Sequence, residues 1–245
     1  MQFSLWYNSR QAEGKGFLMM KIVVFDSGYG GEGFADYLEQ ELPVAEIIRV
    51  IDWRHASEIL SGVKEARKCA ETALTPYFNK VDLIVFANYL LTTTSLNYFK
   101  RKYQNQNFVG LELEHPCSFV EKDVLFLTTK ALAKSMNCRI FVHKLRQSFR
   151  LKTLLLDSWP AKIDDGELQL SEIKETIYRD VINEGFTPSK VIIGCSQFND
   201  IIPDLKRVLG RSIEICNWTR DVTSEIYKTL KIRGNICKNR RPRGR

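Results

Sequence analysis

A short apolar strand followed at once by a glycine-rich turn constrains the fold more than any other stretch of this chain. Residues 22–25, Ile-Val-Val-Phe, form a β-branched run that is typical of a strand buried on both faces of a parallel sheet. Asp26 and Ser27 end the run, glycines follow, and an apolar stripe at helical spacing begins at Phe34. Ligands of open α/β sheets bind at the carboxyl ends of strands. The pattern therefore predicts a ligand-facing edge at Asp26 and Ser27.

The glycine-rich turn is compatible with two functions, and a third interpretation gives it a purely structural role. Gly28, Gly30 and Gly33 match the G-x-G-x-x-G pattern of dinucleotide-binding turns. Asp52 lies nineteen residues beyond Gly33, near the place of a ribose-binding acid. The acid and hydroxyl that end the strand would instead serve a small substrate, which we favour because an ionised carboxylate repels a pyrophosphate at close range. A plain strand-to-helix turn would need these glycines only for positive φ.

The excess positive charge lies at the end of the chain. The 245 residues include 36 basic and 29 acidic side chains, which gives a formal net charge of +7. Residues 231–245 contain seven Lys or Arg residues and no acid, so the rest of the chain is close to neutral. A nucleic-acid-binding fold would carry its basic residues on the folded body. We therefore expect a solvated basic tail, with contact to a polyanion as the alternative.

The cysteines and the N-terminal segment indicate a compartment. Six cysteines are widely spaced without a C-x-x-C pair, so no metal site is predicted. Residues 1–19 lack a clear apolar signal-peptide core and are interpreted as an extension before Met20; no transmembrane run is visible. We therefore expect a cytoplasmic protein with reduced thiols and no membrane association.

Strand and helix patterns alternate along the chain, which predicts parallel α/β architecture. Strands are expected at 21–26, 46–51, 82–87, 108–112, 124–128, 139–142, 191–194 and 212–216. Helices are expected at 33–42, 62–78, 93–103, 130–136, 171–183, 202–209 and 220–230. Ser171 is expected to cap the helix that follows it. Residues 144–167 show no clear pattern and are expected to wrap over a surface or cover a site.

Polar residues follow four of these strands. They are Asp26-Ser27, Asn88, Thr129, and the run Cys195-Ser196-Gln197. Together they predict two similar halves, each offering a strand edge to a shared cleft. The predicted fold is α/β, with two doubly wound parallel-sheet lobes and a cleft between them. The first lobe is expected to comprise 20–112 plus 217–230, and the second 113–216.

The motifs and their order resemble the aspartate/glutamate racemase superfamily, and within it glutamate racemase. Residues 26–31 (DSGYGG) match the family's D-S-G-x-G-G, and residues 194–199 (GCSQFN) resemble its G-C-T-H-Y-P. Residues 87–89 (ANY) fall where the family has C-N-T. Residues 110–112 and 128–135 resemble the family's entry into its second half. The resemblance extends from residue 20 to about residue 230.

The resemblance implies proton transfer at the Cα of a small amino acid or dicarboxylate, with no cofactor. In this family two cysteines act on opposite faces of Cα, one removing a proton and the other returning one. By resemblance, Cys195 is the second acid/base, and Asp26 assists at the first position. The residues expected to bind the substrate are Ser27, Asn88, Thr129, Ser196 and Gln197. A homodimer is also left open.

Two departures from the family pattern concern the proton-transfer groups themselves. Ala87 stands in place of the first cysteine, and Gln197 in place of the histidine after the second. Removal of an acid/base group typically costs about 10²–10⁴-fold in rate. Three functions stay open: a racemase with another first base (Asp26, His55 or His115), a single-cysteine decarboxylase-like lyase, and non-catalytic binding of a small acid or a macromolecular partner.

Overall fold

The computed structural model describes residues 19–43, 45–111, 123–217 and 219–230. The predictions that concern residues 1–18, the basic tail at 231–245 and His115 fall outside these residues. Within the described part of the chain, no helix is both long and apolar enough to cross a membrane.

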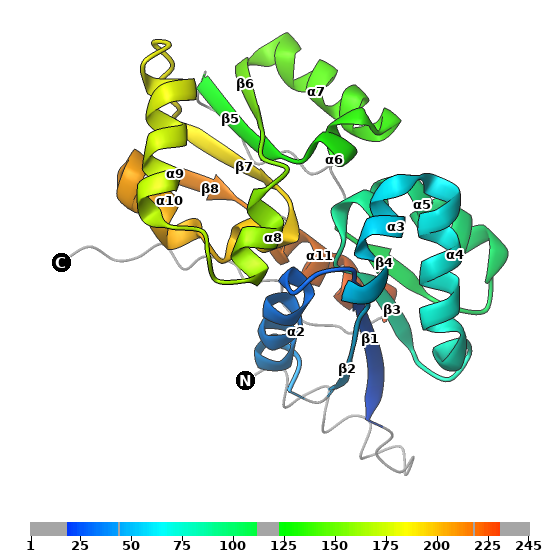
Figure 1. Ribbon diagram of the computed structural model, residues 1–245. Coiled ribbons are helices and arrows are strands. Elements are labelled where there is room, and N and C mark those ends of the chain that lie inside the picture. The colour runs from blue at the N-terminus through cyan, green and yellow to red at the C-terminus, as the bar shows by residue number, and fades with distance from the viewer. Residues whose placement is uncertain (1–18, 44, 112–122, 218, 231–245) are drawn as a thin grey trace.

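The described residues form two parallel sheets of four strands each (Figure 1). The first sheet, in the order β2-β1-β3-β4, contains β1 (Met20–Asp26), β2 (Ala45–Ile51), β3 (Leu83–Phe86) and β4 (Phe108–Gly110). The second, in the order β6-β5-β7-β8, contains β5 (Asp123–Thr128), β6 (Arg150–Leu155), β7 (Lys190–Gly194) and β8 (Glu214–Cys216). Each sheet with its helices is called a lobe below. This arrangement confirms the predicted two-lobe α/β class.

Helices cover both lobes. Those beside the first sheet are α2 (Gly30–Glu41), α3 (Ala56–Ser61), α4 (Val63–Leu74), α5 (Tyr89–Lys102) and α11 (Thr219–Thr229). Those beside the second are α6 (Lys130–Lys134), α7 (Met136–Ser148), α8 (Trp159–Asp164), α9 (Leu170–Ile177) and α10 (Ile202–Leu209). Short irregular turns are η1 (Trp53–His55), η2 (Thr75–Tyr77), η3 (Tyr178–Ile182, a π-helical turn) and η4 (Ser196–Asn199).

Strand β1 shows why the apolar run has no polar face. Ile22 and Val24 pack with α2 and α11 on one face of the sheet, whereas Val23 and Phe25 pack with α3, α4 and α5 on the other. All four side chains are fully buried. A strand that helices cover on both faces has a continuous apolar sequence. The doubly wound lobe predicted from this motif is therefore present.

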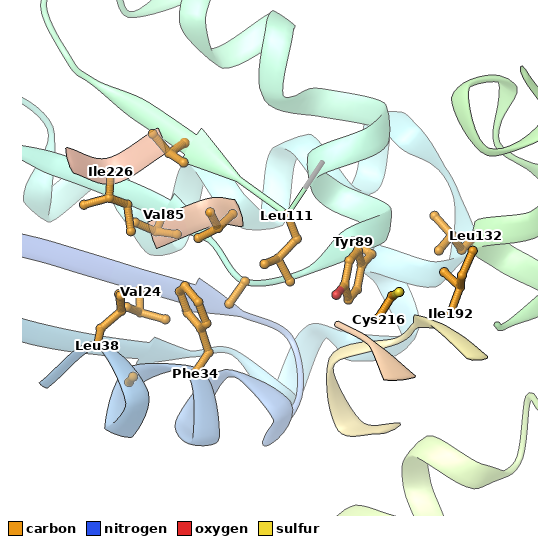
Figure 2. Close-up of a cluster of buried hydrophobic side chains, with 14 of the residues drawn as sticks. Val24, Phe34, Leu38, Val85, Tyr89, Leu111, Leu132, Ile192, Cys216 and Ile226 are labelled. Carbon is orange, nitrogen blue, oxygen red and sulfur yellow. The ribbon is translucent and has the colours of Figure 1, made fainter. Parts of the chain in front are cut away.

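An apolar bridge joins the two lobes. Tyr89 and Leu111 of the first lobe belong to one buried cluster with Leu132, Ile192 and Cys216 of the second. Figure 2 shows Tyr89 between Leu111 and the pair formed by Leu132 and Ile192. Each of these side chains is almost completely shielded from solvent. Apolar burial therefore holds the lobes against each other at the base of their interface.

Two local predictions are wrong. Residues 139–142, predicted as a strand, lie inside helix α7. The Ser135 hydroxyl caps this helix by accepting a hydrogen bond from the Cys138 backbone N–H at 3.3 Å, and Cys138 and Leu145 are buried about two helical turns apart. Ser171 is not a cap, because α9 begins at Leu170.

The segment 144–167 is more regular than predicted. After the end of α7 it forms strand β6, paired with β5, and then helix α8. Strand β6 lies at the edge of its sheet, and only Leu154 among its side chains is buried. Helix α8 brings this segment to the lobe interface, where its last residue, Asp164, meets η4.

Candidate active site between the two lobes

Asp26 accepts hydrogen bonds from both lobes. It ends β1 and is completely buried. Its Oδ1 accepts hydrogen bonds from the Ser27 backbone N–H at 2.6 Å and from Asn88 Nδ2 at 3.0 Å. Its Oδ2 accepts a hydrogen bond from the Ser196 hydroxyl of η4 at 2.9 Å. The strand ends of both sheets therefore converge on one carboxylate.

Asn88 holds this arrangement from the neighbouring strand end. It is the N-cap of α5, where its Oδ1 accepts a hydrogen bond from the Leu91 backbone N–H at 2.8 Å. Its Nδ2 donates to Asp26 Oδ1 and, at 2.8 Å, to the Ser27 hydroxyl. Because both ends of the amide are engaged, capping the helix also fixes the polar group that faces Asp26.

Cys195 follows strand β7 on the other lobe, next to two polar neighbours. Its Sγ donates to Gln197 Oε1 at 2.9 Å. The Ser196 hydroxyl lies 3.1 Å from the same oxygen. At its other end, Gln197 Nε2 donates to Asp164 Oδ2 at 3.3 Å. One chain of side chains thus connects Asp26 through Ser196 and Gln197 to Cys195 and Asp164.

Burial changes the proton affinity of the two candidate proton-transfer groups. Desolvation raises the pKa of Asp26 to about 7, although hydrogen bonds from Asn88, Ser196 and the backbone of Ser27 oppose the shift. Burial raises the pKa of the Cys195 thiol, and the negative charges of Asp26 and Asp164 raise it further. Near neutral pH, Asp26 therefore exchanges a proton readily, whereas Cys195 keeps its own.

The glycines of the turn make room for the opposite lobe. A Cβ on Gly28 would lie 2.1 Å from Gln197 Nε2, and one on Gly30 would lie 2.6 Å from the backbone of Ser196 and Gln197. Neither glycine has a positive φ, so the interpretation of the turn as a positive-φ turn is wrong. Because η4 lies directly against Gly30, the turn does not present the open surface that a pyrophosphate requires.

Three residues from the predictions lie elsewhere. Thr129 caps α6 by accepting a hydrogen bond from the Leu132 backbone N–H at 3.4 Å, and no hydrogen bond among the described residues joins it to the Asp26 network. Asp52 is paired with His55, whose Nδ1 lies 2.8 Å from the carboxylate. Half of the His55 side chain is exposed.

Ala87 lies at the end of β3 and is completely buried. Its backbone N–H donates to the Phe25 carbonyl at 2.8 Å, and its methyl group belongs to the apolar cluster that bridges the lobes. Asp26 and Cys195 thus supply an acid and a thiol, whereas the buried Ala87 methyl group offers no proton-transfer group.

A cavity of about 580 Å³ opens beside this network. Ser196 and Asn199 of η4 line it together with Gly30, Phe34 and Tyr37 of α2. Its size suits a small organic molecule, and it shares Ser196 with the Asp26 network.

Asp164 is the residue of this site that sequence reasoning missed. In the sequence it is visible only as part of an Asp-Asp-Gly turn, and nothing in its spacing relates it to Gln197, 33 residues further along. Burial raises its pKa, whereas the hydrogen bond from Gln197 and the backbone of Tyr29 lower it. Only the fold reveals that it contacts the second polar motif.

Comparison with known proteins identifies the architecture. No family model matches the chain. A glutamate racemase of Lachnospira eligens is 22% identical over 228 residues, which cover 88% of this chain and 83% of the relative. A glutamate racemase of Aliarcobacter butzleri is 23% identical over 215 residues, which cover 80% of this chain and 78% of the relative.

Solved structures agree with this similarity. Escherichia coli glutamate racemase, in complex with L-glutamate and the activator UDP-MurNAc-ala, superposes with a TM-score of 0.73 at 19% identity, covering 88% of this chain and 84% of that one. The chain has the glutamate racemase fold. The Campylobacter jejuni enzyme gives 0.71 at 21% identity, over 90% of this chain and 88% of that one. These similarities support the aspartate/glutamate racemase superfamily, to which the motifs pointed.

Proposed function

We propose that this protein binds a small amino acid or dicarboxylate between its lobes and transfers a proton at the Cα of that ligand without a cofactor. The relatives named above are glutamate racemases, and two of the similar structures contain L-glutamate or D-glutamate. The observation that carries the proposal is the buried bond between Asp26 and Ser196, which assembles residues of both lobes beside Cys195.

The roles follow from the protonation of the two groups. Cys195 acts as the acid, because its partly buried thiol lies near two carboxylates and donates to a carbonyl oxygen. Asp26 acts as the base, because a pKa of about 7 is close to the ideal for proton transfer near neutral pH. Ser27, Asn88 and Ser196 supply the hydroxyl and amide groups that bind the polar ends of the ligand.

Ala87 decides how far the activity departs from that of a racemase. We propose that it stands where the family has its first cysteine, so that the two-cysteine route to inversion is lost or strongly reduced. An alanine methyl group in an apolar wall neither gives nor takes a proton. Proton exchange on a single face, with retention of configuration, then replaces racemisation.

A decarboxylase-like lyase is the second candidate, and the protonated state of Cys195 favours it. Loss of CO₂ from a malonate-type acid leaves the electron pair of the broken C–C bond on Cα. The thiol of Cys195 then gives its proton to that carbon, and the resulting thiolate recovers a proton from solvent. This reaction needs one acid and no base at Ala87.

The deciding experiment is proton NMR of the purified protein in D₂O with L-glutamate and with L-aspartate. We expect the Cα proton signal to decay in a reaction that Cys195→Ala abolishes and Cys69→Ala, a partly buried cysteine on α4, leaves intact. Circular dichroism of the same samples separates inversion from retention. Absence of exchange in both amino acids, with release of CO₂ from a substituted malonate, would replace the first function by the second. Absence of both reactions would leave binding alone.

A further inference from the structure

The side-chain amide of Gln197 is held at both ends, and the two contacts have opposite chemical requirements. Its Oε1 accepts from Cys195 Sγ at 2.9 Å, and its Nε2 donates to Asp164 Oδ2 at 3.3 Å. The side chain is almost completely buried and lies against Gly28, where a Cβ would be 2.1 Å from Nε2. The amide therefore has little freedom to move between the lobes.

The orientation of this amide depends on Asp164. An ionised carboxylate can only accept hydrogen bonds, so it must face the NH₂ group and not the carbonyl oxygen. The carbonyl is then left pointing at Cys195, where it accepts the S–H bond. A flipped amide would place NH₂ against sulfur and stabilise the thiolate instead, since hydrogen bonds to the charged form favour that form.

We propose that Asp164 is a positioning residue that keeps Cys195 in its thiol form by fixing the amide of Gln197. The inference rests on the proposed function and specifies which direction of proton transfer the site allows. Cys195 delivers a proton to one face of the ligand carbon and does not withdraw one. Asp164 has no contact with the ligand in this role and acts through Gln197.

The charges around both groups agree with this role. The carboxylates of Asp26 and Asp164 act on Cys195, and those of Asp165 and Asp200 lie near Asp164. Asp26 and Asp164 carry the same sign as a thiolate, so both disfavour that form of Cys195. Oδ1 of Asp164 is buried and makes no hydrogen bond with the described residues, and the carboxylate is held by Gln197 at Oδ2 and by the backbone of Tyr29.

The test measures the proton on Cys195 and not turnover. Alkylation of Cys195 by iodoacetamide is followed by peptide mass spectrometry across pH, and the midpoint of the rate profile reports thiolate formation. For Asp164→Ala we expect the midpoint to fall by about one pH unit, which corresponds to about tenfold more thiolate at a fixed pH below the midpoint. Greater access to the cysteine would raise the plateau rate without moving the midpoint.

Two variants separate orientation from charge and from general disturbance. Asp164→Asn removes the negative charge but keeps an acceptor oxygen for Gln197, so its midpoint should fall less than that of Asp164→Ala. Asp165→Asn alters the exposed neighbour and should leave the midpoint unchanged. An equal fall in Asp164→Asn and Asp164→Ala would show a charge effect and overturn the proposal, as would no fall in Asp164→Ala.

A further variant covers the case in which Asp164→Ala does not fold. Gln197→Leu keeps the size of the side chain and removes the acceptor, so the proposal expects a lower midpoint there too. An unchanged midpoint would mean that burial alone holds the proton, and the proposal would fail. Because none of these readouts requires catalysis, failure here is distinguishable from failure to exchange the Cα proton.

Discussion

Gly30→Ala tests whether the turn glycines exist to admit the opposite lobe. The added Cβ would lie 2.6 Å from the backbone of Ser196 and Gln197, whereas ordinary contact begins at 3.4 Å. The lobes would have to separate by about 0.8 Å at this point. A comparable shift of the 2.9 Å bond between Ser196 and Asp26 would take it beyond hydrogen-bonding distance. Overpacking of this kind costs about 1–3 kcal/mol.

Gly33→Ala is the matched control because it lies on the same helix, α2. Its Cβ would lie 3.6 Å from Asp200 Oδ1, which is an ordinary contact. Alanine favours a helix over glycine by about 1 kcal/mol, so this variant should gain stability. Urea unfolding measures the free energy of unfolding of both variants. In the D₂O assay, the rate of Cα proton exchange should fall about 100-fold for Gly30→Ala alone, since misplacement of catalytic groups by about 1 Å can cost that much. Equal gains of stability in both variants, with unchanged exchange, would refute the close-approach argument.

Three further perturbations address the candidate site and its surroundings. Asp26→Asn should abolish exchange and change the pH dependence of unfolding. Because folding raises the pKa of Asp26 from 3.8 to about 7, the protonated acid stabilises the fold below pH 3.8, and this stabilisation is lost as the pH rises to about 7, by at most about 4 kcal/mol. Urea unfolding of the variant should therefore lack this decline in stability. Ala87→Cys should cost about 1–3 kcal/mol in the packed wall and give inversion detectable by circular dichroism, whereas retention only would count against Ala87 as the missing position. Thr129→Ala should lower stability by about 1 kcal/mol through the lost α6 cap and leave exchange unchanged; a large loss of exchange would return Thr129 to the site.

The part of the site that the sequence predicts is the part fixed by local rules. Asp26 and Cys195 follow buried apolar strands, and parallel strands of a doubly wound sheet end at one edge. Asn88 caps the next helix, which is a local role with its own sequence preference. These positions follow from strand, turn and cap chemistry within a few residues of each motif.

The misassigned elements show where local rules compete. Residues 139–142 are Arg-Ile-Phe-Val, which suits a strand, yet the Ser135 cap and the helical stripe of Cys138 and Leu145 place them in a helix. Strand β6 pairs with β5 at a sheet edge, where only Leu154 is buried. Its register depends on a partner strand 27 residues away. The sequence of the segment alone therefore shows little hydrophobic periodicity.

The role of the turn glycines required the folded chain. Positive φ is a local property, but the space over Gly28 and Gly30 is taken by Ser196 and Gln197, more than 160 residues later. The same holds for Asp164, which no motif marks. Contacts across the lobe interface therefore decide both why these glycines are needed and which carboxylate holds Gln197.

The hydrogen bonds that the Asp26 carboxylate already accepts limit how a ligand can reach it. Its carboxylate accepts from the backbones of Ser27 and Gly28 and from the side chains of Asn88 and Ser196, which uses the four acceptor positions of the group. Of these donors, only Ser196 belongs to the second lobe. A ligand that reaches Asp26 must therefore replace Ser196, and the hydroxyl that is released becomes available to the ligand itself. Since the apolar bridge at Tyr89 stays buried between the lobes, this exchange needs a small opening at η4 and not full separation of the lobes.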